Sequence, residues 1–273
     1  MSILLGLLAS LLIGSSDFLG ARAAGRTTPL QTTTAAFLGG AVTVTLLSPL
    51  LGSPSVRDLL LGAGSGVAAF AALTTLWWAY ARSSVGVAAP IAAVVSTVLP
   101  VLYDAVGGES PGAVGWCGVA VGCMALVLTS WAPGSRGRRD GIVLGGLAGV
   151  AFAAMFLIAV ASSPDAGTWP VASQRATAFV LAVVAGLATR RAPFADLASV
   201  RWSMLAGVFG ASGVSAVVYG GQRGPIAPVI VSGSMYPAVV VAMAWVFMHQ
   251  RLRPAQVAGL VAALAGVALI ALD

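Results

Sequence analysis

Two charged side chains stand inside long apolar stretches of this sequence. Asp17 lies fourteen residues into the apolar run 3–21, and Arg175 lies about one-third of the way into the run 168–189. A charge within a lipid-embedded helix is costly, and it usually faces a cavity or a charged partner. Asp17 is therefore a candidate for binding a substrate amine or a coupling proton, and Arg175 is a candidate for binding a substrate carboxylate.

Each of these two residues also has a structural explanation. Asp17 could be an interfacial residue of a short first helix, with its side chain reaching water, and we weigh this evenly against a functional role. Arg175 could pair with Asp17 across two helices. We slightly favour this ion pair, because an unpaired buried charge destabilises the fold.

Aromatic, proline and polar residues form a second group of candidates. Trp77 and Tyr80 end one apolar run and Tyr219 ends another, so an aromatic belt at the membrane surface is the favoured explanation, and stacking on a cationic or aromatic substrate is the alternative. Tyr236 lies within a run beside Ser234, where polar groups need a function. Prolines within helices free carbonyl groups that can bind a substrate or an ion. The predicted substrate-binding residues are Asp17, Trp77, Tyr80, Pro90, Ser96, Gln174, Arg175, Tyr219, Pro228, Ser234 and Tyr236.

The elements that hold these residues are predicted to be membrane-spanning helices. Hydrophobic residues make up 59% of the 273 residues and charged residues only 8%, too few charges to cover the surface of a soluble protein. A spanning helix needs about 20 mainly apolar residues. Such runs predict an all-α membrane protein with ten transmembrane helices, at 3–21, 29–51, 59–80, 85–106, 111–131, 141–161, 168–189, 202–221, 225–248 and 254–272.

The chain reads as one unit used twice. Pro90 and Pro228 are 138 residues apart, and so are Ser96 and Ser234. Five spans are an odd number, so the second unit would enter the membrane from the opposite side. This is the inverted-repeat plan of many secondary transporters, whose binding site lies between the halves near the midplane. The predicted domains are a five-helix repeat at 1–132, a charged linker at 133–140 and a second five-helix repeat at 141–273.

Several classes of function are disfavoured by the sequence. The net charge of +6 comes from scattered arginines between apolar runs, so no nucleic-acid partner is expected. Cys117 and Cys123 share one apolar run and His249 is the only histidine, so we predict no metal and no cofactor. The sequence G-E-S-P-G at 108–112 fits a hydrolase pattern, but no strand precedes it. We predict that the protein is not an enzyme.

With these features in place, the chain resembles the ten-helix, EamA-like members of the drug/metabolite transporter superfamily over essentially its whole length. The acidic residue of the family's G-E-R-L-S motif corresponds to Glu109, whereas Gln250 replaces it in the second copy. The resemblance rests on I-G-S-S-D-F-L-G (13–20), G-V-A-A-P-I with its following Ser and Pro (86–100), G-E-S-P (108–111), W-P-V-A-S-Q-R (169–175), G-P-I-A-P-V (224–229), Y-P (236–237) and R-L-R-P-A-Q-V-A-G (251–259).

The resemblance implies secondary transport by alternating access, with a cavity between helices one, three, four, six, eight and nine and with helices five and ten packed at the ends. We therefore expect a multi-pass protein of the bacterial cytoplasmic membrane that exports a small polar metabolite such as an amino acid. Protons are a candidate coupling ion, and the protein would act in the lipid bilayer as a monomer or homodimer. Export of cationic amphiphilic drugs remains an alternative, as does a membrane-embedded enzyme or scaffold without transport.

Arginine placement bears on the orientation in the membrane. Loops after odd-numbered predicted spans carry eleven arginines, and loops after even-numbered spans carry two. Because cytoplasmic loops are enriched in positive charge, this bias would place both termini outside the cytoplasm. The family resemblance implies both termini inside, so the orientation stays open.

Overall fold

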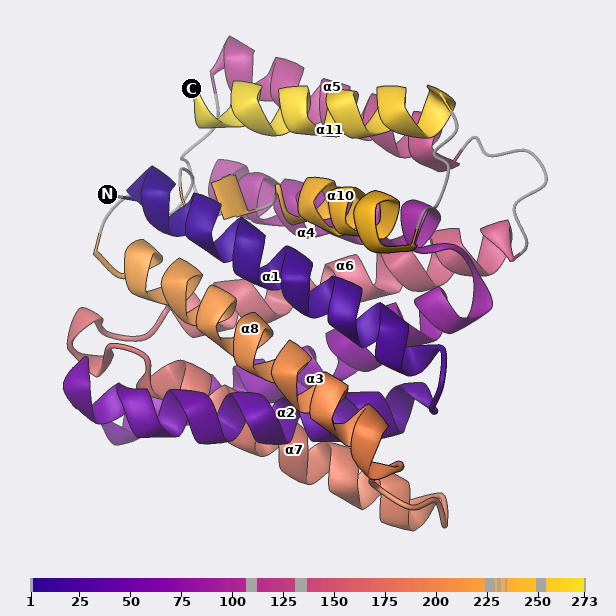
Figure 1. Cartoon of the computed structure of the whole chain (residues 1–273). Coiled ribbons are helices and arrows are strands. Elements are labelled where there is room, and N and C mark those ends of the chain that lie inside the picture. Colours follow the sequence, from indigo (N-terminus) through magenta and orange to yellow (C-terminus); the bar gives the residue numbers. More distant parts are fainter. Residues whose placement is uncertain are drawn as a thin grey trace.

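The structure is a computed structural model that describes residues 2–106, 112–130, 137–223, 229, 232–233, 235–248 and 254–272. Glu109, His249 and Gln250 lie outside these residues. In the described part of the chain all regular secondary structure is helical (Figure 1). The helices are α1 (Ser2–Ala24), α2 (Pro29–Leu47), α3 (Val56–Arg82), α4 (Val85–Val106), α5 (Ala113–Ser130), α6 (Arg138–Val160), α7 (Trp169–Ala188), α8 (Leu197–Gly221), α10 (Tyr236–Met248) and α11 (Pro254–Ala271), with short 3-10 helices η1 (Ser48–Leu50) and η2 (Pro164–Ala166).

Helix boundaries follow the local signals in the sequence. α4 covers the predicted run 85–106 residue for residue. α3 begins earlier than predicted because Ser55 and Asp58 form a capping box around its first turn. α8 also begins earlier, because the Asp196 side chain accepts a hydrogen bond from the Ser199 backbone N–H at 3.1 Å. Hydrogen bonds from Ser199 hold the pKa of the exposed Asp196 carboxyl below its usual value.

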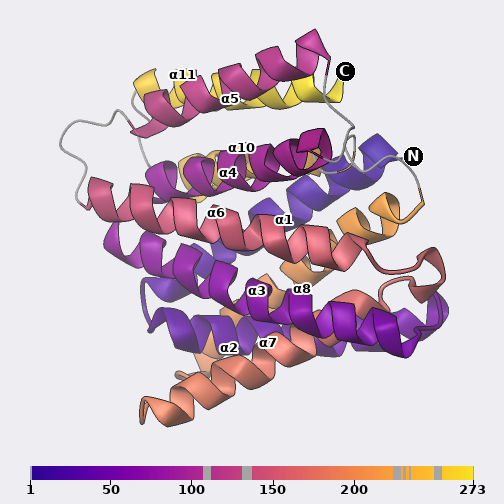
Figure 2. The same ribbon diagram turned by 180° about the vertical axis from the view of Figure 1, so that it is seen from behind.

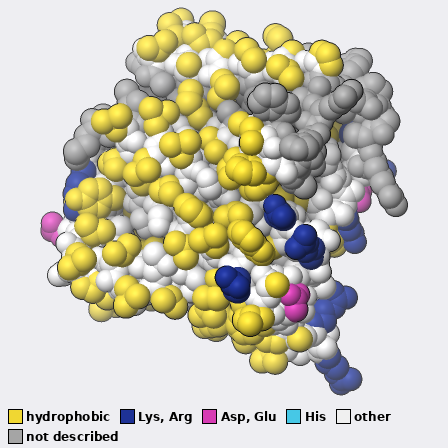
Figure 3. All heavy atoms as spheres, in the orientation of Figure 1, with side chains coloured by type: hydrophobic (Ala, Val, Ile, Leu, Met, Phe, Trp, Pro, Cys, Tyr) yellow, Lys and Arg dark blue, Asp and Glu magenta, His cyan; other side chains and the backbone are white. Residues whose placement is uncertain are grey.

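The helices have the length and surface of membrane spans. Large apolar side chains such as Leu46 (72%) and Leu147 (58%) are exposed on the outside of the bundle, where a soluble protein would carry charges. Figure 3 shows apolar side chains spread over the visible face and most of its arginines gathered toward one end. The chain is therefore a multi-pass membrane protein. Among the described residues, six helical segments are long and apolar enough to span a membrane, namely Leu4–Ala23, Pro29–Leu50, Val56–Arg82, Arg138–Val160, Trp169–Ala188 and Leu197–Gly221.

Helices from the beginning of the chain pack mainly on helices from its end. α1 and α2 lie on α8, α3 lies on α6 and α7, and α4 lies on α6 (Figures 1 and 2). α5 and α11 form a pair at one side of the bundle, as the resemblance implied for the fifth and tenth helices. Both termini lie at the same end of the helices (Figure 1).

Glycines allow these helices to approach closely. A Cβ atom at Gly207 of α8 would overlap the backbone of Ala36 in α2, and one at Gly66 of α3 would lie 2.6 Å from the Gln174 carbonyl oxygen in α7. Side chains at these positions would therefore push the helices apart. Gly62 and Gly66 of α3 both pack on α7, and the glycines spaced by four in α6 lie against α4.

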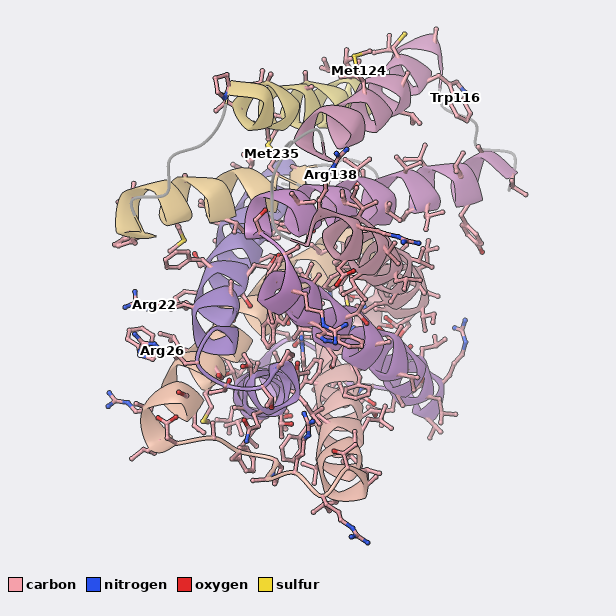
Figure 4. All side chains as sticks on the ribbon, turned by 90° about the vertical axis from the view of Figure 1, so that its right-hand side faces the viewer. Arg22, Arg26, Trp116, Met124, Arg138 and Met235 are labelled. Atoms are coloured by element: carbon pink, nitrogen blue, oxygen red, sulfur yellow. The ribbon has the colours of Figure 1, made fainter. Side chains whose placement is uncertain are left out.

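Arginines mark the end of the bundle opposite the termini. Figure 4 looks onto this end, where Arg22 of α1 and Arg26, two residues after α1, point outward and Arg138 stands at the start of α6. Exposed arginines at the ends of the neighbouring helices add to the same end, namely Arg82, Arg139, Arg190, Arg191 and Arg201. The opposite end has Arg57 and Arg223. The described structure thus separates the charges into an arginine-rich end and an arginine-poor end.

Candidate functional site

A cavity lies inside the helix bundle. Its empty volume, which includes the space at its opening, is about 820 Å³. Residues of α1, α3, α4, α6, α8 and α10 contribute to its wall. Because α10 lies in the ninth predicted span, these are the helices that the family resemblance implied. Residues of α2 and α7 line the cavity as well. Its polar lining residues are Ser16, Asp17, Ser96, Arg175 and Tyr236.

Asp17 lies on the α1 side of this cavity. Its side chain is only 4% exposed, and it is placed by two close contacts of α1. Gly14 packs on the start of α10 near the Tyr236 carbonyl, and Gly20 packs on the indole of Trp77 in α3. The Tyr80 hydroxyl lies near the Asp17 carboxylate, but the two groups do not form a well-aligned hydrogen bond. Asp17 is thus buried within the bundle and does not lie at an interface with water.

Arg175 lies on the α7 side of the same cavity and is 6% exposed. Its Nη2 atom donates to the Gly210 carbonyl of α8 at 3.3 Å, and its guanidinium lies 5.6 Å from the centre of the Phe37 ring. Gly40 leaves room for the aliphatic stem, since a Cβ there would lie 3.4 Å from Arg175 Cδ. The Arg175 Nε atom is buried and has no hydrogen-bond partner among the described residues.

The favoured ion pair between Asp17 and Arg175 is not formed. The two side chains line one cavity, but their charged atoms make no salt bridge within the ranges that the structure describes. Helix packing explains the difference, because Arg175 is drawn to the Gly210 carbonyl and the Phe37 ring while Asp17 faces α3 and α10. The cavity therefore contains two separate, oppositely charged groups.

Ser96 and Tyr236 complete the polar lining. The Tyr236 hydroxyl interacts with the Ser96 hydroxyl, and Ser96 Oγ lies 3.0 Å from the Ala93 carbonyl oxygen, to which it donates. Tyr236 also lies near Asp17. These contacts join α4 and α10 at the cavity wall, so two of the predicted polar residues lie beside the predicted carboxylate.

Other predicted residues lie outside the cavity wall. Trp77 is fully buried and Tyr80 is 7% exposed, so the membrane-surface belt favoured for them is wrong. They pack between α3 and α1, because Gly20 opens a space that the Trp77 indole fills. Gln174 is also fully buried, and its Nε2 donates to Ser65 Oγ at 2.6 Å, which joins α7 to α3.

The remaining predicted residues fall into two groups. Tyr219 lies near the end of α8, where the Arg223 guanidinium stacks on its ring at 3.7 Å, and it does not reach the cavity. The backbone of Pro90 belongs to α4, but its side chain is not described. Pro228 and Ser234 lie outside the described residues.

Part of the cavity wall is apolar. It consists mainly of Phe152, Met155 and Phe156 from α6, with Leu73 of α3 and Val214 of α8. None of these was among the predicted site residues, because an apolar side chain in an apolar span has no sequence signal of its own. The cavity is therefore polar on the α1 and α7 sides and aromatic on the α6 side.

Asp58 links two segments of the chain at the arginine-poor end of the bundle. Its carboxylate is buried and joins the start of α3 to the segment 161–169 between α6 and α7. Oδ1 accepts from the Ser163 backbone N–H at 2.8 Å, and Oδ2 accepts from Ser163 Oγ at 2.9 Å. Oδ2 also accepts from the Ser55 backbone N–H at 3.0 Å. One carboxylate thus stabilises a helix start and a contact between two loops.

Further hydrogen bonds extend this contact. Trp169 Nε1 donates to the Gly52 carbonyl at 2.9 Å, and the Ser48 and Thr168 hydroxyls are 2.9 Å apart. Arg223 Nη2 donates to the Pro164 carbonyl at 2.8 Å. We call this set of contacts among residues 48–58, 161–169 and 222–223 the loop contact.

Comparisons with known proteins agree with this architecture. Residues 139–272 match the EamA-like transporter family. The fold is similar to a crystal structure of another protein, with a TM-score of 0.72 and 17% sequence identity over 99% of this chain and 96% of that chain. At this identity the likeness concerns the fold alone, but it extends through the part of the chain before residue 139. No curated protein matches the sequence. The second half of the chain thus matches the EamA-like transporter family, and this match, on a chain with a helical membrane fold, is consistent with the drug/metabolite transporter superfamily.

Proposed function

We propose that the protein exports a small polar metabolite, such as an amino acid, by proton-coupled alternating access. The observation that carries this proposal is the central cavity, in which Asp17 and Arg175 are buried without pairing to each other. Buried charges in a membrane protein usually mark a substrate or ion pathway. In the proposed site, Ser96 and Tyr236 add hydroxyl groups beside Asp17.

The helix arrangement supports alternating access between two inverted five-helix halves. If the chain is divided after α5, the packing of α1 on α8 has a counterpart in the packing of α6 on α3. In the same way, α2 on α8 corresponds to α7 on α3, and α4 on α6 corresponds to α10 on α1. Two related halves of opposite orientation would give this reciprocal pattern, and they allow the cavity between them to open to one side at a time.

Counterflow in proteoliposomes tests transport directly. Vesicles loaded with one unlabelled compound, from a panel of amino acids, amines, carboxylates and nucleosides, are placed in a trace of the same compound in labelled form. A transporter exchanges the label inward without any ion gradient. We expect at least one small polar metabolite to exchange, and Asp165→Asn, which changes an exposed carboxylate outside the cavity, to exchange it equally.

Proton coupling is tested with the same vesicles. If Asp17 carries the coupling proton, Asp17→Asn loses the accumulation driven by an imposed pH gradient, even at substrate concentrations high enough for its counterflow to be measured. Gradient-driven accumulation by Asp17→Asn at the parent level would contradict the coupling role. If the parent protein, purified in folded form, exchanged none of the compounds, this result would contradict transport of small metabolites and favour a scaffold or enzyme.

Export of cationic amphiphiles is the second candidate, because Phe152 and Phe156 add aromatic rings to a cavity that also contains a carboxylate. Arg175 weakens this candidate, since a cation in the cavity would lie near a like charge. Exchange of lipophilic cations in preference to amino acids would favour it over the main proposal.

A further inference from the structure

The charges of the cavity are complementary to a zwitterion. Asp17 and Arg175 are each more than nine-tenths buried, line the same cavity and form no salt bridge. Removing an unpaired charge from water is unfavourable, and the cost is recovered only when an opposite charge or several hydrogen bonds satisfy it. A ligand with one charge would satisfy one of these groups and leave the other unpaired.

The donors of Arg175 are only partly used by the protein. One guanidinium nitrogen donates to the Gly210 carbonyl at 3.3 Å, a long hydrogen bond, and Nε has no partner among the described residues. A guanidinium binds a carboxylate through two parallel hydrogen bonds, so these free donors suit a carboxylate ligand. Arg175 is therefore suited to bind an anion inside the bundle.

Asp17 offers the opposite charge close to this site. The Gly210 carbonyl that holds Arg175 lies where α8 meets α1, because a Cβ at Gly210 would be 2.6 Å from Ser16 Oγ. Asp17 follows Ser16 in the chain, and both line the cavity. A small molecule whose ammonium and carboxylate share one carbon atom could contact both groups from this position.

The α6 side of the cavity specifies the rest of the ligand. Phe152, Met155 and Phe156 form an apolar part of the cavity wall, and no described charged side chain other than Asp17 and Arg175 lines the cavity. A polar ligand side chain would lose hydration against this wall without gaining partners, whereas an apolar one would gain contact area.

We infer that the substrate is a zwitterionic amino acid with an apolar side chain, whose ammonium binds Asp17, whose carboxylate binds Arg175 and whose side chain packs on Phe152 and Phe156. This inference rests on the proposed transport function and narrows its substrate class. Selectivity follows from the same geometry, because a ligand that lacks one charge leaves a buried protein charge unpaired.

Three matched ligands test the inference in binding to the purified protein. Phenylalanine carries both charges, 2-phenylethylamine lacks the carboxylate, and 3-phenylpropanoate lacks the ammonium, while all three share the aromatic ring. We expect phenylalanine to bind more tightly than either analogue by a factor on the order of 10 to 100, the range expected for one unpaired charge-assisted hydrogen-bonding group. Glycine, which lacks the side chain, should also bind more weakly.

Two variants should produce a crossed pattern. Arg175→Gln should weaken phenylalanine binding without weakening 2-phenylethylamine binding, and Asp17→Asn should weaken phenylalanine binding without weakening 3-phenylpropanoate binding. Arg201→Gln, at an exposed arginine of α8, is the matched control and should bind all three ligands as the parent does. If Arg175→Gln does not fold, Arg175→Lys keeps the charge, loses the two parallel hydrogen bonds and should still weaken phenylalanine binding.

The outcomes separate this inference from the proposed function. Equal binding of phenylalanine and 2-phenylethylamine, unchanged in Arg175→Gln or Arg175→Lys, would overturn the zwitterion and favour a cation. Failure of the whole series to bind, with counterflow of a nucleoside or another metabolite intact, would overturn the inference and leave transport standing. Failure of counterflow for every compound would overturn both.

Discussion

Replacement of Asp58 by alanine should lower the thermal stability of the protein by a large amount. The carboxylate accepts hydrogen bonds from the backbone N–H groups of Ser55 and Ser163 at 3.0 and 2.8 Å, and from both of their hydroxyls at 2.7 and 2.9 Å. In Asp58→Ala the hydroxyls can turn toward other partners, but the two backbone donors cannot.

The magnitude follows from these two donors. A hydrogen bond to a charged group contributes roughly 1.5–3 kcal/mol, so losing two should cost about 3–6 kcal/mol. For a chain of this size, 1 kcal/mol corresponds to about 2–4 °C in melting temperature, which gives a decrease on the order of 10 °C. Because Asp58 joins α3 to the segment 161–169, the loss should also loosen the loop contact.

The measurement is thermal unfolding of the purified protein in one detergent, followed by an intrinsic or thiol-reactive fluorophore. Asp165→Ala is the matched control, since it removes an exposed carboxylate from η2 in the same loop contact, and it should stay within about 2 °C of the parent. Equal melting of Asp58→Ala and Asp165→Ala would refute the reasoning. A double-mutant cycle with Ser163→Ala should show coupling, because the two residues share hydrogen bonds.

Three further perturbations have definite expected outcomes. Gly207→Val should destabilise the protein by about 1–3 kcal/mol or prevent folding, because its side chain would overlap the Ala36 backbone; a melting temperature equal to that of the parent would contradict this packing. Gln174→Leu should change the melting temperature little, since it removes one hydrogen bond to Ser65 and also a buried carbonyl oxygen that has no partner among the described residues; a drop as large as that of Asp58→Ala would contradict this balance. In a variant without native cysteines, the positive-inside rule predicts that Arg57→Cys reacts with an impermeant maleimide in intact cells and that a cysteine in place of any arginine at the arginine-rich end does not; the reverse labelling would place both termini in the cytoplasm.

The helices could be read from the sequence because each has local signals. Apolar runs near 20 residues long, separated by proline, glycine and arginine, predicted nearly every helix of the described residues. The errors were at helix starts, where Ser55 with Asp58, and Asp196 with Ser199, extend α3 and α8 past charged residues that had been assigned to loops. Capping depends on which hydrogen bonds a side chain makes, and spacing alone does not determine this.

The site was only partly predictable. Asp17, Ser96, Arg175 and Tyr236 were found because polar groups within apolar spans stand out, and the structure brings them to one cavity. The sequence could not show whether Asp17 and Arg175 pair with each other, because this depends on the Gly210 carbonyl that Arg175 contacts in the folded structure. The α6 wall has no sequence signal.

The burial of Trp77 depended on a distant feature that was equally hard to see. Gly20, on another helix, opens the space that the Trp77 indole occupies. Such a contact between α1 and α3 is set by tertiary packing, so the sequence around Trp77 alone favoured an aromatic at the membrane surface.

The packing of α1 on α8 has a consequence for how the protein is made. α1 ends at Ala24 and α8 begins at Leu197, so the principal partner of the first helix is synthesised late. At roughly 5–20 residues per second, the ribosome needs on the order of 10 to 30 s to cover this interval. During that time α1 and its buried carboxylate lie in the bilayer or the insertion machinery without their final neighbour. The early helices are therefore synthesised well before α1 can reach its final packing partner, and a chain truncated before α8 would leave the α8-facing side of α1 without that partner.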